Sequence, residues 1–279
     1  MTQPKLDEKY ERMQQILREL ESVAVAFSAG VDSTFVLKVA IDTLGPKNVV
    51  AVTGRSDSLA RAEFEEACKL ADAVGAEHVI LDTDEFENPD YTANPADRCY
   101  HCKTALYTRL KGFIAERGIK ASVSGNNADD LGDFRPGLQA ADEHQVRSPV
   151  AEAGLTKGDV RELSKRLGLP THDKPASPCL ASRVPYGEEI TPEKLHMIEL
   201  AEAFLREEMD IRECRVRHHG NLARIEVPPV FIKTLAEPEN AARIERHFRS
   251  LGYTYVALDL RGFRSGSMNE VIAFGKIQP

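Results

Sequence analysis

Three cysteines are the residues of this sequence with the clearest capacity for chemistry. Cys99 and Cys102 form a C-x-x-C pair in DRCYHCK, directly before an expected helix, and Cys179 stands much later in SPCLASR. Three chemistries suit this set. A zinc site would need His172 as a fourth ligand, a redox dithiol would use only the pair, and three thiolates can hold an iron–sulfur cube with one open iron. Structural thiols without a chemical role are the plain alternative.

The total cysteine count bears on the compartment. The chain has 279 residues and five cysteines, and an odd count in a long chain argues against a disulfide scaffold and for reduced thiols. Cys68 and Cys214 fit structural thiols on a helix face and at a strand start. The start MTQPKLDEKYERM lacks the apolar core of a secretory signal, and no apolar stretch approaches the roughly 20 residues that span a bilayer. We therefore expect a cytoplasmic protein with no membrane partner.

The stretch AFSAGVDST forms a second candidate site between an expected strand and an expected helix. Ser28, Ala29 and Gly30 are small enough for the backbone to wrap a phosphate group, and the following helix offers N–H groups and its positive dipole end. Asp32 can hold Mg²⁺ against phosphate oxygens, and Ser33 can donate a hydroxyl. The Walker lysine and glycine spacing are missing, so this is either another kind of phosphate loop or a generic turn.

A further loop, SGNNADDLGDFRPG, also follows an expected strand. Its aspartates Asp129, Asp130 and Asp133 can hold a metal, and Arg135 can face a phosphate. An acidic surface loop with Asx turns is the alternative. The nucleotide contacts expected from these loops and the neighbouring strand end are Ser28, Gly30, Val31, Asp32, Ser33, Thr53, Gly125, Asp130 and Arg135.

Alternating strand and helix patterns must position these loops. Short apolar runs predict strands at 22–27, 48–53, 76–83 and 121–125, and helical periodicity predicts helices at 6–20, 35–45, 60–75, 103–117 and 156–168. Strict alternation predicts right-handed βαβ units and an α/β fold, with a Rossmann-like parallel sheet covered on both faces. Ligands should gather at the carboxyl ends of the strands.

The proline-rich segment 170–189 separates this pattern from a smaller α+β unit. It contains four prolines and little periodicity, which is typical of a functional loop at a domain boundary. The elements expected after it are a helix at 191–208 with Thr191 as its cap, a strand pair around Gly220-Asn221, helices at 228–250 and a strand at 253–260. We expect domains at 1–175 and 176–279.

The charge balance makes nucleic acid an unlikely partner. There are 36 Lys and Arg against 44 Asp and Glu, so the formal net charge is −8. Such a field repels polyanions, although it permits a local basic patch. A general nucleic-acid binder is therefore disfavoured.

Six stretches together resemble the LarE family nearly from end to end: AFSAGVDST, RCYHCK, NNADDLGDFRPG, PCLASRVPYG, RVRHHGNLARIEV and LDLRGFRSGSMNE. The first resembles the PP-loop (SGGxDS) of ATP pyrophosphatases, with Ala29 in place of the first glycine. The resemblance implies an ATP-dependent sulfur transferase that builds the nickel-pincer nucleotide cofactor of lactate racemase and related enzymes. It adenylates the carboxylates of pyridinium-3,5-biscarboxylic acid mononucleotide and converts them to thiocarboxylates.

The family has two forms that differ in the source of sulfur. Sacrificial members carry a lone cysteine, which aligns by eye with Pro178, and lack the C-x-x-C pair. This chain resembles the three-cysteine form, in which Cys99, Cys102 and Cys179 hold a [4Fe-4S] cluster whose open iron carries the sulfide. A sacrificial role for Cys179 without a cluster is the closest alternative. The source that resupplies the sulfide is not indicated.

The resemblance also implies a substrate site in the second domain and a hexameric assembly with that domain at the contacts. Arg215 and Arg217 alternate on one expected strand and so face the same side, where they can bind the substrate's phosphate. Two glutamates can orient these arginines, bind metal or form plain salt bridges. The substrate-binding set is Ser182, Arg183, Glu202, Arg215, Arg217 and Glu226, and the implied cofactors are ATP, Mg²⁺ and the cluster.

Two other functions compete with this one. A PP-loop tRNA thiolase would need a basic RNA surface or an added RNA-binding domain, which the acidic balance weighs against. An ATP-sensing or assembly protein without catalysis would release no pyrophosphate from ATP in the presence of the substrate.

Overall fold

The computed structural model describes residues 3–132 and 136–264, and the chain divides into two compact units. One comprises Met1–Glu85 and Asp97–Ser177, and the other comprises Phe86–Ala96 and Pro178–Pro279. The segment 86–96 groups with the second unit because its backbone is tied there: the N–H of Ile190 donates to the Thr92 carbonyl at 2.8 Å. The predicted domain limits of 1–175 and 176–279 stay a prediction.

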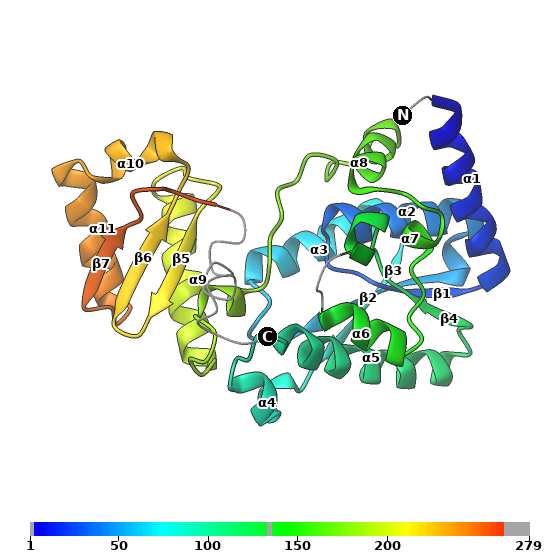
Figure 1. Ribbon diagram of the computed structural model, residues 1–279, viewed down its shortest axis with the longest axis horizontal. Coiled ribbons are helices and arrows are strands. Elements are labelled where there is room, and N and C mark those ends of the chain that lie inside the picture. Colours follow the sequence, from blue (N-terminus) through cyan, green and yellow to red (C-terminus); the bar gives the residue numbers. More distant parts are fainter. Residues whose placement is uncertain (1–2, 133–135, 265–279) are drawn as a thin grey trace. The chain divides into compact units, whose positions relative to one another are not determined.

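The first unit is built on four parallel strands in the order β3-β2-β1-β4 (Figure 1). In the register of the sheet, Val25 of β1 is opposite Ala51 on one side and Val123 on the other. The strand bounds are β1 Val23–Ala26, β2 Val49–Arg55, β3 Glu77–Asp82 and β4 Ala121–Val123. Because β1 and β4 are neighbours, the loops that follow them meet at the same edge of the sheet.

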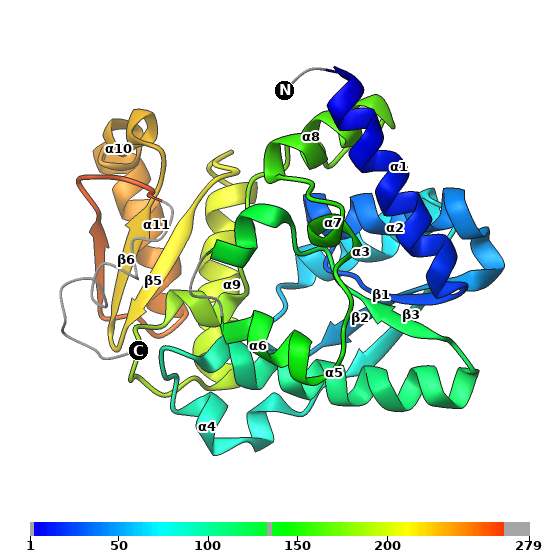
Figure 2. The same cartoon turned by 45° about the vertical axis from the view of Figure 1, so that its right-hand side comes forward.

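Helices cover both faces of this sheet (Figures 1 and 2). The side chains of β1 alternate between the faces: Val23 and Val25 pack with α1, α2, α3 and α8, whereas Ala24 and Ala26 pack with α5 and α6. The bounds of these helices are α1 Gln3–Leu20, α2 Val31–Leu44, α3 Arg61–Ala73, α5 Arg98–Arg117, α6 Pro136–Glu143 and α8 Lys157–Arg166. The predicted α/β fold with a parallel sheet is confirmed.

The second unit has a small mixed sheet in the order β5-β6-β7, with β5 antiparallel and β7 parallel to β6. Val216, Ile225 and Phe248 lie in its core with residues of α9 and α11. The bounds are β5 Arg215–His219, β6 Leu222–Glu226, β7 Tyr255–Leu258, α9 Pro192–Glu207, α10 Pro229–Leu235 and α11 Pro238–Ser250. The shorter elements are α4 Pro89–Thr92, α7 Pro149–Glu152, η1 Pro46–Asn48, η2 Glu85–Glu87, η3 Ala128–Gly132 and η4 Leu180–Arg183.

Two predicted helix starts are wrong. α5 begins at Arg98 rather than at 103, so Cys99 and Cys102 lie inside the helix and not before it. α2 begins at Val31 rather than at 35, which puts Asp32 in its first turn. Cysteine, tyrosine, histidine, serine and aspartate have middling helix propensity, so these first turns carry little sequence signal. None of the helices that the structure describes is long and apolar enough to cross a membrane.

A buried histidine in the second unit gives its stability a pH dependence. His218 is 3% exposed, and its Nδ1 lies 3.2 Å from the Tyr253 hydroxyl oxygen. Burial, with smaller contributions from Lys194 and His219, lowers the pKa of His218 to about 4. The folded state therefore keeps this ring neutral at pH values where the unfolded chain, with a pKa of about 6.5, takes up a proton.

We expect His218 to lower the free energy of unfolding by about 2 kcal/mol as the pH falls from about 7 to about 5. Urea denaturation across this range measures the effect, and His218→Phe should show a correspondingly flatter dependence. An equally steep dependence in the variant would assign the effect to other groups.

Candidate functional site

The phosphate loop connects β1 to α2 at the carboxyl edge of the parallel sheet (Figure 1). Gly30 is the N-cap of α2 and has no side chain with which to cap the first-turn N–H groups, which suits the binding of an anion there. Val31 is buried in the core and can contribute only its backbone there. Ser33 braces the loop, because its Oγ accepts from the N–H of Ser28 at 3.2 Å and lies 3.2 Å from the Ser28 Oγ.

Asp32 lies at the rim of the loop with its two oxygens in different situations. Oδ2 is paired with the ammonium of Lys157, the first residue of α8. Oδ1 is buried and has no hydrogen-bond partner among the residues that the structure describes. A carboxylate oxygen of this kind suits a hard cation, so Asp32 fits the Mg²⁺ role that the sequence predicts.

The loop after β4 packs directly against the phosphate loop through Gly125. A Cβ at this position would lie 2.8 Å from the Ser33 nitrogen and 2.9 Å from the Asp32 carbonyl carbon. Neither aspartate described in this loop has both oxygens open to a metal, because Asp129 accepts the Lys157 N–H at 2.9 Å and Asp130 accepts the Asn127 N–H at 2.9 Å. Asp133 and Arg135 lie outside the described residues.

Thr53 lies at the end of β2 but its hydroxyl is already engaged. The residue is buried, and its Oγ1 donates to the Phe27 carbonyl at 2.8 Å and lies 2.8 Å from His78 Nε2. The structure therefore uses this side chain to join β2 to the end of β1 and to β3. Its predicted contact with the nucleotide stays a prediction.

In the second unit, Arg183 and Glu202 form a buried bidentate ion pair. Arg183 Nε and Nη2 lie 2.8 and 3.0 Å from the two Glu202 oxygens, and both side chains are at most 3% exposed. Arg183 Nη1 donates to the carbonyl oxygens of Pro178 at 2.6 Å and Cys179 at 3.1 Å, and to Ser182 Oγ at 2.9 Å. All three nitrogens of the Arg183 guanidinium thus donate to protein atoms. Through these bonds Arg183 positions the segment Pro178–Ser182, which contains Cys179.

A second ion pair joins β5, which carries both predicted arginines, to β6. Arg217 Nε and Nη2 lie 3.0 and 2.8 Å from Glu226 Oε2, and Nη1 donates to the Ser182 carbonyl at 3.1 Å. Arg224, which is not among the predicted site residues, has its Nη1 2.8 Å from the other oxygen of Glu226. Burial, together with the nearby Arg183, lowers the pKa of Arg215.

The side chains joined by these interactions carry an excess of positive charge. Among the residues that the structure describes, these interactions bring together six arginines and three carboxylates, an excess of three positive charges. The members of this arginine cluster are Arg183, Arg206, Arg215, Arg217, Arg224 and Arg264, with Glu202, Glu226 and Asp259. Arg183, Arg215 and Arg217 are buried, and the other three arginines are partly exposed. An excess of this sign suits an anionic group such as a phosphate.

The cysteines fall in different parts of the fold. Cys99 is exposed and Cys102 is partly exposed, and they stand three residues apart on α5, so they share one side of the helix. Cys179 is exposed and belongs to the second unit. Within residues 3–132 and 136–264, no group of three His, Cys, Asp or Glu side chains is assembled to hold a metal ion. The predicted cluster is therefore not supported by the structure.

We expect the five thiols to differ sharply in reactivity. Cys214 is fully buried, and burial, with a smaller contribution from Glu202, raises the pKa of its thiol to about 12. Alkylation at about pH 8 followed by mass spectrometry should modify Cys99 and Cys179 first and Cys214 only after denaturation. Labelling of Cys214 in the folded protein at the rate of Cys179 would contradict this burial.

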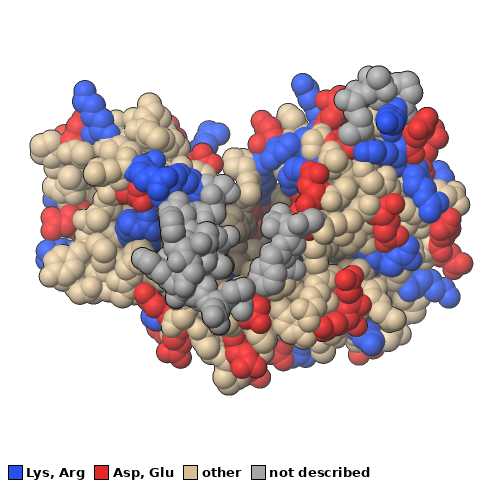
Figure 3. Space-filling model, viewed as in Figure 1, with Lys and Arg blue, Asp and Glu red and all other residues tan. Residues whose placement is uncertain are grey.

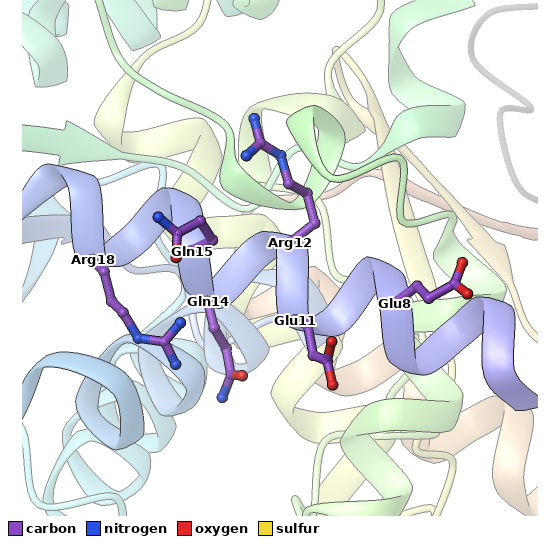
Figure 4. A pocket seen from close by; sticks show the side chains of 6 residues that line it. All are labelled: Glu8, Glu11, Arg12, Gln14, Gln15 and Arg18. Atoms are coloured by element: carbon purple, nitrogen blue, oxygen red, sulfur yellow. The ribbon is translucent and has the colours of Figure 1, made fainter.

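A depression on the surface of α1 is lined by side chains of that helix alone (Figure 4): Glu8, Glu11, Arg12, Gln14, Gln15 and Arg18. In Figure 4 these side chains point in different directions and do not converge on one point. Mixed charges on a single exposed helix face are typical of a solvated surface, so this depression is not a candidate for catalysis.

The expectation that nucleic acid is an unlikely partner stays a prediction. The charges on one face of the molecule can be described. On the face shown in Figure 3, basic and acidic side chains are interspersed, and neither sign forms a continuous stripe. A nucleic-acid backbone is usually met by a basic stripe or patch.

Sequence reasoning missed the two lysines beside the phosphate loop, Lys157 and Lys174. Lys157 directly follows the helix cap Thr156, and its position at the start of α8 is the sequence feature that could have indicated a role at the site. Lys174 Nζ lies 3.3 Å from the Ala29 carbonyl oxygen, but the two residues are 145 positions apart, and no local pattern indicates the contact.

Comparison with known proteins finds similarity over nearly the whole chain, although no family model matches it. The chain is 46% identical over 267 residues to an uncharacterized protein of Synechocystis sp., covering 96% of this chain and 99% of that protein. It is 40% identical over 256 residues to a pyridinium-3,5-bisthiocarboxylic acid mononucleotide synthase of Lactiplantibacillus plantarum, covering 92% of each. An NH₃-dependent NAD⁺ synthetase of Methanococcoides burtonii is 28% identical over 159 residues, or 54% of this chain and 59% of that protein. The first two similarities extend over both units.

Proposed function

The chain belongs to the LarE family of PP-loop ATP pyrophosphatases, and we propose that it converts the carboxylates of pyridinium-3,5-biscarboxylic acid mononucleotide to thiocarboxylates at the expense of ATP. The observation that carries the proposal is the 40% identity with the Lactiplantibacillus plantarum synthase over 92% of both chains. The geometry of the phosphate loop and of the arginine cluster supports it.

The phosphate loop is the proposed site of ATP cleavage. The first-turn N–H groups of α2 bind the triphosphate, and Mg²⁺ held by Asp32 would neutralise its charge. Lys157 stands beside Asp32 and keeps a second positive charge at the rim. A substrate carboxylate oxygen attacks the α-phosphorus, and pyrophosphate leaves. A sulfur nucleophile then attacks the acyl carbon of the adenylate, and AMP leaves.

The arginine cluster is the proposed site for the substrate's phosphate. A phosphate dianion would offset two of its three excess positive charges, and Arg215 and Arg217 face the same side of β5. Arg183 supports this site indirectly, because its three donor nitrogens hold Glu202 and the segment Pro178–Ser182.

The sulfur source has two candidates, of which we favour the cluster. The spacing of Cys99 and Cys102 on one side of α5 suits two ligands of a cluster, with Cys179 as the third, and a cluster with one open iron would supply the sulfide. The second candidate is Cys179 as a sacrificial donor. Two observations are consistent with this second candidate: the Cys179 thiol is exposed, and Arg183 donates a hydrogen bond to the Cys179 carbonyl. The predicted hexamer stays a prediction.

The deciding experiment has two parts. Pyrophosphate and AMP should be released from ATP only when the dicarboxylate mononucleotide is present, and Asp32→Asn should reduce the release by at least about a hundredfold. Absence of pyrophosphate from the wild-type protein with fresh substrate would refute the proposed reaction.

Anaerobic purification with iron and sulfide analysis distinguishes the sulfur sources. A cluster predicts about four iron and four sulfide per chain in the wild type, a loss in Cys99→Ala, and no loss in the matched control Cys68→Ala. A colourless protein that transfers one sulfur and loses the mass of H₂S at Cys179 would establish the sacrificial route instead.

A further inference from the structure

Lys174 connects the phosphate loop to α3. Its Nζ lies 2.8 Å from Glu63 Oε2, 2.6 Å from Glu66 Oε2 and 3.3 Å from the carbonyl oxygen of Ala29. The side chain is 15% exposed. Burial acts to lower the pKa of the ammonium, but the two glutamates raise it above its ordinary value, so the group is charged. One cation thus binds two carboxylates and one backbone carbonyl.

The backbone around Lys174 is fixed as well as its side chain. Arg161 of α8 donates to the carbonyl oxygens of His172 at 2.8 Å and Lys174 at 2.9 Å, and the N–H of Lys174 donates to the Thr171 carbonyl at 3.0 Å. Lys174 therefore reaches the phosphate loop from an anchored segment, and its ammonium has a defined position.

The carbonyl that Lys174 holds belongs to a strained residue. Ala29 has a φ of 55°, a left-handed conformation that costs a residue with a Cβ about 1 kcal/mol or more. Because a trans peptide points its C=O and N–H in opposite directions, holding the Ala29 carbonyl toward Lys174 turns the Gly30 N–H away from it. The bond from the ammonium, at 3.3 Å, favours this one orientation of the peptide.

We propose that Lys174 is a positioning residue of the phosphate loop. With Glu63 and Glu66 it forms a clasp that holds the Ala29 carbonyl and thereby presents the Gly30 N–H to a nucleotide phosphate. The inference rests on the proposed function, because it takes the anion at this loop to be ATP. Lys174 acts through the Ala29–Gly30 peptide and not by touching the phosphate.

The first test needs no nucleotide. Lys174→Met removes the clasp, so amide hydrogen exchange in a peptide spanning the phosphate loop should accelerate about tenfold. The exchange rates of peptides from α5 and β6 should not change. Unchanged exchange in the loop would overturn the proposal. A thermal melt confirms that the variant is folded, and Lys174→Arg, which keeps the charge, should recover part of the protection.

The second test uses the sign of an electrostatic effect. Removing two negative charges beside a phosphate loop should, by Coulomb's law alone, tighten the binding of ATP. The clasp predicts the opposite for Glu63→Gln/Glu66→Gln, a Kd about threefold or more higher, because the ammonium is no longer held against Ala29. Glu65→Gln on the same helix is the matched control, since Glu65 pairs with exposed Arg61. Tighter binding in the double variant would refute the clasp.

The third test separates positioning from direct contact. Lys174→Met should raise the Kd for ATP about tenfold when residue 29 is alanine, and by much less in an Ala29→Gly background, because glycine adopts the left-handed conformation without help. An equal loss in both backgrounds would mean that Lys174 touches the phosphate directly, which contradicts the proposal. A wild-type protein that binds no ATP would refute the proposed function, while the exchange experiment would still decide on the clasp.

Discussion

Glu202→Ala is expected to lower the free energy of unfolding by about 4 kcal/mol. Glu202 is 1% exposed, and its oxygens accept from Arg183 at 2.8 and 3.0 Å and from the N–H of Val216 at 3.0 Å. Its removal leaves the Arg183 guanidinium buried without its counter-ion. It also removes the acceptor of the Val216 N–H in β5. Urea denaturation of the full chain at constant pH measures the loss.

Two variants show whether the loss comes from the buried pair. Glu207→Gln removes a charge from the exposed side of α9 and should change stability by less than about 0.5 kcal/mol. Arg183→Met/Glu202→Leu replaces both charges with apolar groups and should lose less than the sum of the single variants Arg183→Met and Glu202→Leu. A loss below about 1 kcal/mol in Glu202→Ala would mean that solvent reaches this pair.

The sheet and the order of elements could be predicted because each rests on short-range signals. The run SVAVAF is apolar after its serine and shorter than a typical buried helix, and it forms β1, one of the two inner strands of the sheet. Thr156 and Thr191 precede helices whose first turns they cap, as predicted. The alternation of Arg215 and Arg217 likewise places both on one side of β5.

The partners of the site residues could not be predicted because they come from distant parts of the chain. Asp32 meets Lys157 across 125 positions, and Lys174 meets Glu63 across 111. The predicted contact of Arg183 with substrate stays a prediction, and only the folded structure shows that each of its donor nitrogens binds protein atoms. The residue type and its position in a loop indicate which interactions a side chain can make. Which of its hydrogen-bond donors can reach a ligand depends on the residues that pack around it.

Gly125→Ala is expected to raise the Kd for ATP by about a hundredfold or more. Gly125 has an ordinary φ, so the substitution costs nothing in backbone conformation. The added Cβ, however, would stand 2.8 Å from the Ser33 nitrogen and 3.0 Å from the Asp32 Cβ. The nearest atom is backbone at the start of α2 and cannot rotate away, so the loop and the N–H groups that bind phosphate must shift. Titration with a fluorescent ATP analogue measures the change.

Gly112→Ala is the matched control for this substitution. Gly112 lies inside α5, and a Cβ there would meet nothing within 4 Å. The variant should leave ATP binding unchanged and raise the free energy of unfolding by about 0.5–1 kcal/mol, because alanine loses less backbone entropy in a helix. If Gly125→Ala bound ATP as tightly as Gly112→Ala, the loop after β4 would be free to move away, and the phosphate site would not depend on its close contact with α2.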